Sequence, residues 1–202
     1  MQLNWVERLF ILSPLRAFLQ HHLEAKMLLD MGGPLPGAHV LEIGCGPGFG
    51  IDLLYRRFQA ARVDAFDIDP KMIAVVQRRQ KAHRRSNRLW VGNTRHIPVA
   101  DRSYDAVVNF GAIHHVVRWR RAIAEIHRVL KPGGAFCCEE ILRRYITHPL
   151  LGRLMDHPQE DRFDAQQFLA ALQQYGFRIQ ASRQLADLYL WVVAIKNGHH
   201  SN

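Results

Sequence analysis

The sequence has 202 residues, of which 48% are hydrophobic and 22% are charged. This length predicts a single domain with a substantial core, and the composition is that of an ordinary globular protein. No apolar run reaches the roughly 18 residues that a membrane-spanning helix needs, and charged Glu7, Arg8 and Arg16 interrupt the apolar N-terminus, which argues against a signal peptide. We therefore expect a cytoplasmic protein.

The formal net charge of +9 indicates affinity for anionic partners or surfaces. Residues 77–88 carry a run of basic side chains without an acidic one: Arg78, Arg79, Lys81, Arg84, Arg85 and Arg88. One interpretation is a solvated helix end and loop. The other is a contact for nucleic acid, anionic lipid or an acidic substrate, with nucleic acid less favoured because no aromatic residues alternate with the basic ones.

Two helices are expected before the first strand. Residues 3–12 form the first, and Ser13 followed by Pro14 is typical of an N-cap and first helical position of the second. The second helix is expected to end at residues 31–34, where glycines and a proline follow one another. Its inward face is expected to carry Leu15, Phe18, Leu19, His22, Leu23 and Leu29.

Residues 40–48 read as an apolar strand followed by glycines at every second position, and helical spacing continues through residues 49–58. A dinucleotide fingerprint would require glycine where Phe49 stands, and a P-loop would require lysine and serine or threonine there. Pro47 also removes a backbone N–H that a pyrophosphate-binding nest would use. The turn therefore favours a nucleoside ligand without phosphate.

The second predicted strand, residues 62–66, leads directly into Asp67. Asp67 lies about 19 residues beyond the last glycine of the turn, near the spacing at which a carboxylate accepts hydrogen bonds from ribose hydroxyls. Asp69 is expected to cap the helix that begins at Pro70. Asp64, inside the strand, is expected at the surface.

The third and fourth predicted strands, residues 89–91 and 106–110, also end at the edge where open α/β sheets bind ligands. Asp105 is expected to hold the sheet edge near the first strand. His114 and His115 follow the fourth strand, and two interpretations remain open for them. They act as a general base near working pH, or they cap the next helix and pack beneath the ligand.

A helix is expected over residues 118–130, followed by a sharp stop at residues 131–134 and a fifth strand over residues 135–140. The strand ends in Glu139 and Glu140. Adjacent strand residues face opposite sides, so at most one should point into a pocket, and the other is expected to meet a surface arginine. The same alternation separates the neighbouring cysteines of this strand, and with Cys45 they show no metal-binding spacing, so we expect reduced thiols and no metal site.

The segment 141–163 is irregular and polar. A long connection at the ligand-binding edge of the sheet is a natural place for residues that determine which acceptor substrate binds. Tyr145, His148 and His157 are its candidate site residues. Asp164 is expected to cap a last helix, residues 165–175. Two strands, residues 177–182 and 188–195, then form a closing hairpin.

The segment Glu42-Ile43-Gly44-Cys45-Gly46-Pro47-Gly48 resembles the first motif of class I S-adenosylmethionine-dependent methyltransferases, and the Leu-Lys-Pro-Gly-Gly passage before the fifth strand resembles another family feature. Within the superfamily the chain is similar to the small-molecule group that includes the ubiquinone/menaquinone-biosynthesis enzymes. The resemblance implies a Rossmann-like three-layer α/β sandwich with N-terminal lid helices. Its seven-stranded, mostly parallel sheet would have the order 3-2-1-4-5-7-6, with the last strand antiparallel.

We expect one methyltransferase domain over residues 1–202. It would consist of N-terminal helices (1–33), a cofactor-binding core (38–140), an acceptor-side insertion (141–163) and a last helix with its hairpin (164–196).

By resemblance, the cofactor is S-adenosylmethionine, Asp67 binds its ribose, and Ile68 and Met72 lie beside its adenine. The family usually has Gly-Asp-Ala where this chain has Gly92-Asn93-Thr94. The amide oxygen of Asn93 would therefore accept a hydrogen bond from the adenine amino group, without the charge that an aspartate would add. The implied cofactor-binding residues are Glu42, Gly44, Cys45, Gly46, Gly48, Asp67, Ile68, Met72, Asn93, Thr94, Asn109 and Phe110. The catalytic candidates are His114, His115 and Glu140.

The implied reaction is in-line transfer of the cofactor's methyl group to a small-molecule acceptor, with catalysis mainly by positioning and desolvation. A small-molecule acceptor is favoured because no Asn-Pro-Pro-Tyr motif follows the fourth strand and no RNA-binding appendage is recognisable. Two alternatives remain. The first is an RNA or protein methyltransferase, which the basic charge favours. The second is a non-catalytic protein that binds S-adenosylmethionine but transfers no methyl group.

Overall fold

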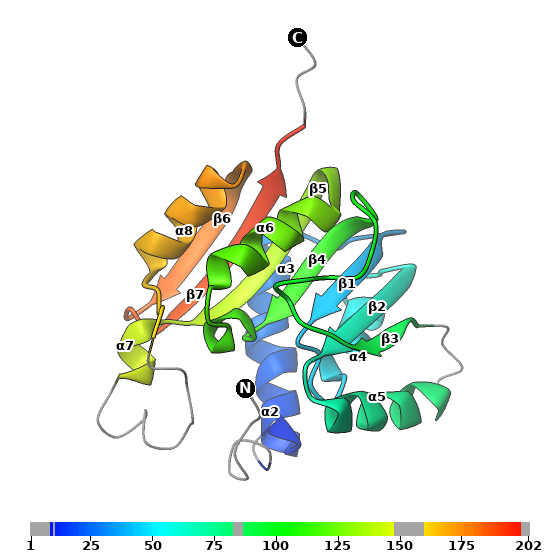
Figure 1. The fold of residues 1–202 in the computed structure, drawn as a ribbon. Helices are drawn as coiled ribbons and strands as arrows, with labels where there is room; N and C mark the ends of the chain where they lie inside the picture. The colour runs from blue at the N-terminus through cyan, green and yellow to red at the C-terminus, as the bar shows by residue number, and fades with distance from the viewer. Residues whose placement is uncertain (1–8, 10, 83–86, 148–159, 199–202) are drawn as a thin grey trace.

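The computed structural model describes residues 9, 11–82, 87–147 and 160–198. Within them, the chain forms a seven-stranded sheet covered by helices (Figure 1). Its strands are β1 (His39–Ile43), β2 (Arg62–Asp67), β3 (Leu89–Val91), β4 (Tyr104–Phe110), β5 (Leu130–Ile141), β6 (Phe177–Leu185) and β7 (Tyr189–Lys196). The order β3-β2-β1-β4-β5-β7-β6, with β7 antiparallel to both of its neighbours, confirms the predicted sheet.

Two apolar clusters fill the space on the two faces of the sheet, because successive side chains of a strand alternate between faces. In β1, Val40 belongs to the cluster with α3 and α4, whereas Leu41 and Ile43 belong to the cluster with α6 and α8. Figure 1 shows α6 and α8 in front of the sheet. The helices are α2 (Pro14–Leu19), α3 (Ala25–Gly32), α4 (Phe49–Arg56), α5 (Pro70–Ala82), α6 (Trp119–Val129), α7 (Arg143–Ile146) and α8 (Ala165–Gln174). None of the described helices is long and apolar enough to cross a membrane.

The second predicted helix begins as predicted, since the Ser13 hydroxyl accepts a hydrogen bond from the Arg16 N–H at 3.2 Å and Pro14 occupies the first turn. The predicted inward face holds for Leu29, which packs against an apolar cluster, and is wrong for the exposed Leu15, Phe18, His22 and Leu23. Leu15 and Phe18 are each 58% exposed, whereas Gln20 is buried. A π-helical segment, η1 (Gln20–Glu24), lies between α2 and α3, and its wider turn rotates the side chains away from the regular helical register.

Residues 1–8 and 10 lie outside the described part of the chain, which therefore does not test the predicted first helix.

Asp64 is buried, which corrects the expectation of a surface residue. Its carboxylate accepts hydrogen bonds from His39 Nε2 at 2.9 Å, from the Arg88 N–H at 3.1 Å and from the Tyr104 hydroxyl at 3.2 Å. The expectation failed because strands of a parallel sheet are covered on both faces, so β2 has no solvent side. Asp105 meets its expectation, since it accepts the His39 N–H at 2.9 Å and so links β4 to β1.

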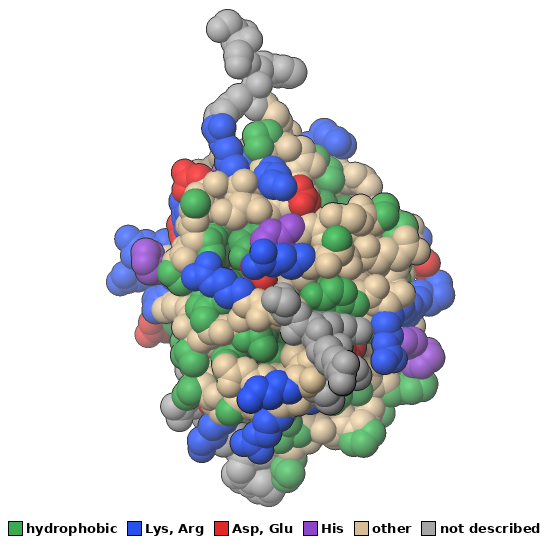
Figure 2. All heavy atoms as spheres, turned by 90° about the vertical axis from the view of Figure 1, so that its right-hand side faces the viewer, with side chains coloured by type: hydrophobic (Ala, Val, Ile, Leu, Met, Phe, Trp, Pro, Cys, Tyr) green, Lys and Arg blue, Asp and Glu red, His purple; other side chains and the backbone are tan. Residues whose placement is uncertain are grey.

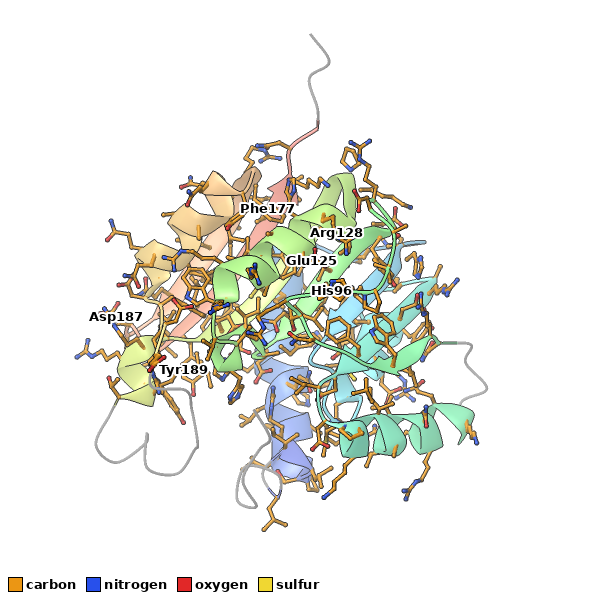
Figure 3. The ribbon with its side chains drawn as sticks, in the orientation of Figure 1. His96, Glu125, Arg128, Phe177, Asp187 and Tyr189 are labelled. Atoms are coloured by element: carbon orange, nitrogen blue, oxygen red, sulfur yellow. The ribbon has the colours of Figure 1, made fainter. Side chains whose placement is uncertain are left out.

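The helix caps follow the sequence prediction. Asp69 accepts the Lys71 N–H at 2.9 Å in front of α5, and Asp164 forms a reciprocal capping box with Gln167 at α8. On α6, Glu125 and Arg128 lie close together near His96 (Figure 3). They bind the N–H and the carbonyl of Ile97 at 2.8 and 2.7 Å, which fixes the loop that leads into β4.

β5 begins five residues earlier than predicted, at Leu130 instead of residue 135. Its register with β4 jumps from Tyr104 opposite Leu130 to Ala106 opposite Ala135, so residues 131–134 bulge out of the ladder. Cys137 and Cys138 are buried in the two different apolar clusters, which confirms that they face opposite sides.

Candidate functional site

A cavity of about 520 Å³ lies at the carboxyl ends of β1, β2, β4 and β5. The chain order reverses between β1 and β4, and open α/β sheets bind ligands at such a switch point. The N-terminal helices contribute Leu19, Gln20 and Glu24 to its wall, and Tyr145 of α7 and Tyr189 of β7 contribute to it from the other end of the sheet. Figure 3 shows Tyr189 beside α7.

The turn after β1 forms one side of this cavity. Gly44, Gly46 and Gly48 have φ angles of +64°, +50° and +83°, a region that favours glycine. Gly44 is also constrained by space, because a Cβ atom there would lie 2.3 Å from Cβ of Ala112. The Cys45 N–H donates to the Phe66 carbonyl at 3.0 Å, which ties the turn to the end of β2.

Asp67 lies at the end of β2 and lines the cavity. One carboxylate oxygen accepts the Gly46 N–H at 2.9 Å, and the other accepts the Asp69 N–H at 2.8 Å. Burial raises the pKa of this carboxyl, although both backbone hydrogen bonds oppose the rise. Each oxygen keeps room for a second donor, so the pair presents two fixed acceptors to a ligand.

Glu42 reaches the same cavity from β1 and is 1% exposed. Its Oε2 atom has no hydrogen-bond partner within the described residues, and burial raises its pKa well above the ordinary range. Gly50 makes this position possible, because a Cβ there would lie 1.9 Å from Oε1 of Glu42. A buried carboxyl oxygen without a donor among the described residues suits a ligand that brings a donor or a positive charge.

Asn93 and Thr94 line the cavity after β3. The Asn93 side-chain oxygen accepts the Arg95 N–H at 3.0 Å, which holds the amide close to its own backbone. The same oxygen also accepts the Arg95 Nε–H at 3.4 Å, so a ligand donor at this oxygen would replace that longer hydrogen bond.

Glu139 and Glu140 point to opposite sides of β5, as expected. Glu139 lines the cavity and Glu140 does not. Glu140 is fully buried and accepts the N–H groups of Ile113 and His114 at 2.8 and 3.0 Å, and His114 Nδ1 lies 2.7 Å from its Oε2. Burial raises the pKa of Glu140 to about 8 against the effect of these hydrogen bonds.

The expected contact of the second glutamate with a surface arginine is therefore wrong. β5 is covered on both faces, so Glu140 meets the short 3-10 helix Ile113–His115 instead of solvent. His114 and His115 line the cavity with ring centroids 4.2 Å apart. Glu140 thus stands behind His114 and fixes the orientation of its ring.

The structure brings most of the predicted site residues to one cavity. Those that line it are Glu42, Gly44, Cys45, Gly46, Asp67, Ile68, Asn93, Thr94, Phe110, His114 and His115. Four others do not line it, namely Gly48, Met72, Asn109 and Glu140. Gly48 precedes α4, Met72 is buried in the core, and Asn109 holds the turn after β4 through the Ala112 N–H at 3.0 Å.

Tyr145 lines the cavity, whereas His148 and His157 lie outside the described residues.

Several polar residues of the cavity were not assigned to the site from sequence, among them Arg16, Gln20, Glu24 and Glu139. The first three are spaced by four residues, so they share one side of the N-terminal helical run, and this polar stripe was the available signal. Arg16 Nη1 pairs with Glu24 Oε1 at 2.7 Å.

The methyltransferase domain family model matches residues 41–138. The demethylmenaquinone methyltransferase of Lactiplantibacillus plantarum is 31% identical over 168 residues, which cover 70% of this chain and 70% of that protein. The phthiotriol/phenolphthiotriol dimycocerosates methyltransferase of Mycobacterium tuberculosis is 30% identical over 179 residues, or 88% of this chain. The chain spans only 64% of the length of this mycobacterial relative.

Among solved structures, an S-adenosylmethionine-dependent methyltransferase from Aquifex aeolicus has a TM-score of 0.72 at 18% identity, covering 94% of this chain and 96% of the other. At this identity the likeness supports the fold alone.

Proposed function

The chain belongs to the class I S-adenosylmethionine-dependent methyltransferases, and from this premise we propose that it methylates a small-molecule acceptor. One arrangement carries the proposal. The carboxylates of Asp67 and Glu42 and the glycine turn lie on one cavity at the ends of two neighbouring strands. When bound, S-adenosylmethionine supplies a methyl group on a positively charged sulfur.

The donor and acceptor set of the cavity fits this cofactor. The two oxygens of Asp67 suit the neighbouring hydroxyls of a ribose, and each already has a backbone donor that fixes its position. Oε2 of Glu42, which has no hydrogen-bond partner in the described part of the chain, suits the cofactor's ammonium group. Asn93 offers an amide oxygen for the adenine amino group.

The remaining wall favours positioning and exclusion of water. Phe110, Ile141 and Tyr189 give this part of the cavity an apolar surface, which strengthens every polar contact inside it. His114 is oriented by its 2.7 Å contact with Glu140, so its ring presents a fixed edge to the acceptor. We propose that His114 orients the acceptor or receives its proton, with Glu140 acting through it.

The names of the relatives support a small-molecule acceptor over RNA or protein. One relative is named for demethylmenaquinone, and the other for phthiotriol and phenolphthiotriol dimycocerosates.

Transfer of a radiolabelled methyl group from S-adenosylmethionine into a metabolite extract tests this function. We expect label in the small-molecule fraction, reduced at least tenfold by Asp67→Ala and unchanged by Asp30→Ala on the protein surface. Label that enters only RNA or protein would favour the alternative acceptors. Tight cofactor binding without transfer to any fraction would instead identify a binding protein.

A further inference from the structure

Glu139 is a buried carboxyl that faces the cavity. The residue is 3% exposed, and its carboxylate oxygens take part in none of the hydrogen bonds formed among the described residues, although the charge of Arg16 acts on it. Burial raises the pKa of Glu139 well above its ordinary range, and the nearby Glu24 raises it further. Leaving such a group without a partner costs free energy, which a ligand of suitable charge would recover.

The space in front of Glu139 is kept open by a glycine. Gly111 has a φ of +73°, and a Cβ built on it would lie 3.2 Å from Oε2 of Glu139 and 3.6 Å from Cε1 of His114. Both side chains therefore border the same small volume. A group bound there would contact Glu139 and the histidine that the proposed function places beside the acceptor.

The charges around this volume are unbalanced. Arg16 binds Glu24 at 2.7 Å and points a second nitrogen at the Phe110 carbonyl, 3.5 Å away, so its charge is already engaged. Glu24 nevertheless keeps a buried Oε2 without a hydrogen-bond partner in the described structure. This part of the cavity thus offers two buried carboxyls, Glu24 and Glu139, against one arginine.

Glu139 is also set apart from the carboxyl that suits the cofactor. Glu42 lies on β1 opposite Val108, whereas Glu139 lies on β5 opposite Phe110. The two glutamates are therefore two strands apart, or roughly 10 Å at the usual strand spacing. This separation of the two backbone positions leaves Glu139 open to a second molecule beside the cofactor.

We infer that the methyl acceptor is a small molecule with a positively charged amino group, which binds to Glu139 in the volume beside Gly111 and His114. This inference rests on the proposed function, because it assigns the second ligand of the same cavity. Tyr145 and Tyr189, whose ring centroids lie 5.4 Å apart on the cavity wall, add aromatic faces that attract a cation or stack on an aromatic amine.

Benzylamine and the neutral benzyl alcohol, two aromatic probes of similar size, test the inference. Each is titrated by calorimetry into protein saturated with S-adenosylhomocysteine. We expect benzylamine to bind at least tenfold more tightly than benzyl alcohol. Glu139→Gln should abolish this preference and keep the affinity for S-adenosylhomocysteine within twofold, whereas Glu160→Gln, an exposed control outside the cavity, should change neither.

Equal affinity of the two probes, no binding of either, or a preference that survives Glu139→Gln would overturn the inference. A large loss of S-adenosylhomocysteine affinity in a folded Glu139→Gln protein would also overturn it, because Glu139 would then hold the cofactor. Failure of the wild-type protein to bind S-adenosylhomocysteine would refute the proposed function itself. This binding is measured before either probe is added, so the two failures can be told apart.

If Glu139→Gln does not fold, the pH dependence of probe binding to the wild-type protein tests the inference instead. The preference for benzylamine should rise with increasing pH as the carboxyl ionises, throughout the range in which the amine stays charged. A ratio that does not change with pH in that range would overturn the inference.

Discussion

Asp64 ties β1, β2 and β4 together through one carboxylate. Burial alone would raise its pKa, but hydrogen bonds from Arg88, His39 and Arg62 outweigh burial and hold the pKa below its ordinary value. A lowered pKa contributes stability that is present above the unfolded-state pKa, about 3.9, and is lost as the pH falls through the folded-state value.

We therefore predict that Asp64→Asn lowers the free energy of unfolding by about 2 kcal/mol at neutral pH, because hydrogen bonds to a buried charge are lost. The difference from wild type should shrink below about pH 4 in urea unfolding. Asp30→Asn, at an exposed ion pair with Lys26, should leave the free energy of unfolding nearly unchanged. If Asp64→Asn lowered the free energy of unfolding by the same amount at neutral pH and below about pH 4, this account would be contradicted.

Substitution of Asn93 tests the part of the cavity that is proposed to bind the adenine. Asn93→Ala should weaken S-adenosylhomocysteine binding by about 1 kcal/mol, the usual net value of one neutral hydrogen bond. The dissociation constant is measured by calorimetry beside Asn197→Ala, which removes an exposed amide outside the cavity. If both variants bound the ligand as wild type does, Asn93 would no longer belong to the proposed site.

The site residues that could be predicted from the sequence are those whose positions are set by the ends of the predicted strands. Asp67 is the last residue of β2 and Asn93 follows β3 by two residues, so their spacing alone indicated that they reach the cavity edge. Glu139 and Glu140 were found as a pair, but which of them faces the cavity depends on the pleat of β5 and its neighbours. Neither periodicity nor spacing sets that choice.

The glycine turn is the element on which the cavity depends most. Gly44→Ala should lower the free energy of unfolding by about 3 kcal/mol, since it adds a clash with Ala112 to the strain of a positive φ. Gly37 is a matched control, because its φ is +74° and a Cβ there would meet nothing within 4 Å. Gly37→Ala should therefore cost only about 1 kcal/mol, the strain alone. Equal losses for the two variants in chemical unfolding would show that the close contact with Ala112 is unimportant.

The N-terminal helical run shows why sequence periodicity failed for one element. Caps and stop signals located its ends correctly, since they are local chemistry. Its buried side was mispredicted because the π-helical segment at Gln20–Glu24 breaks the regular spacing. The same rotation turns Gln20 inward and leaves Phe18 exposed, so the polar stripe reaches the cavity.

At the scale of the whole molecule, the basic charge does not form a single patch on the face drawn in Figure 2, where lysine and arginine side chains are scattered with hydrophobic side chains between them. Two arginines of the basic run at residues 77–88 have structural contacts. Arg79 pairs with Asp52 at 3.0 Å and lies over the Phe49 ring, and Arg88 lies over Trp90. These contacts favour the solvated-surface interpretation for that part of the run.

The sheet order and both apolar clusters place the ends of β1 and β2 side by side, and the whole account depends on what binds there. Calorimetric titration with S-adenosylhomocysteine tests this most directly. The account predicts one bound ligand per chain, with affinity reduced at least tenfold by Asp67→Ala and unchanged by Asp30→Ala. A folded wild-type protein that binds nothing at millimolar ligand, or an Asp67→Ala variant with unaltered affinity, would contradict it.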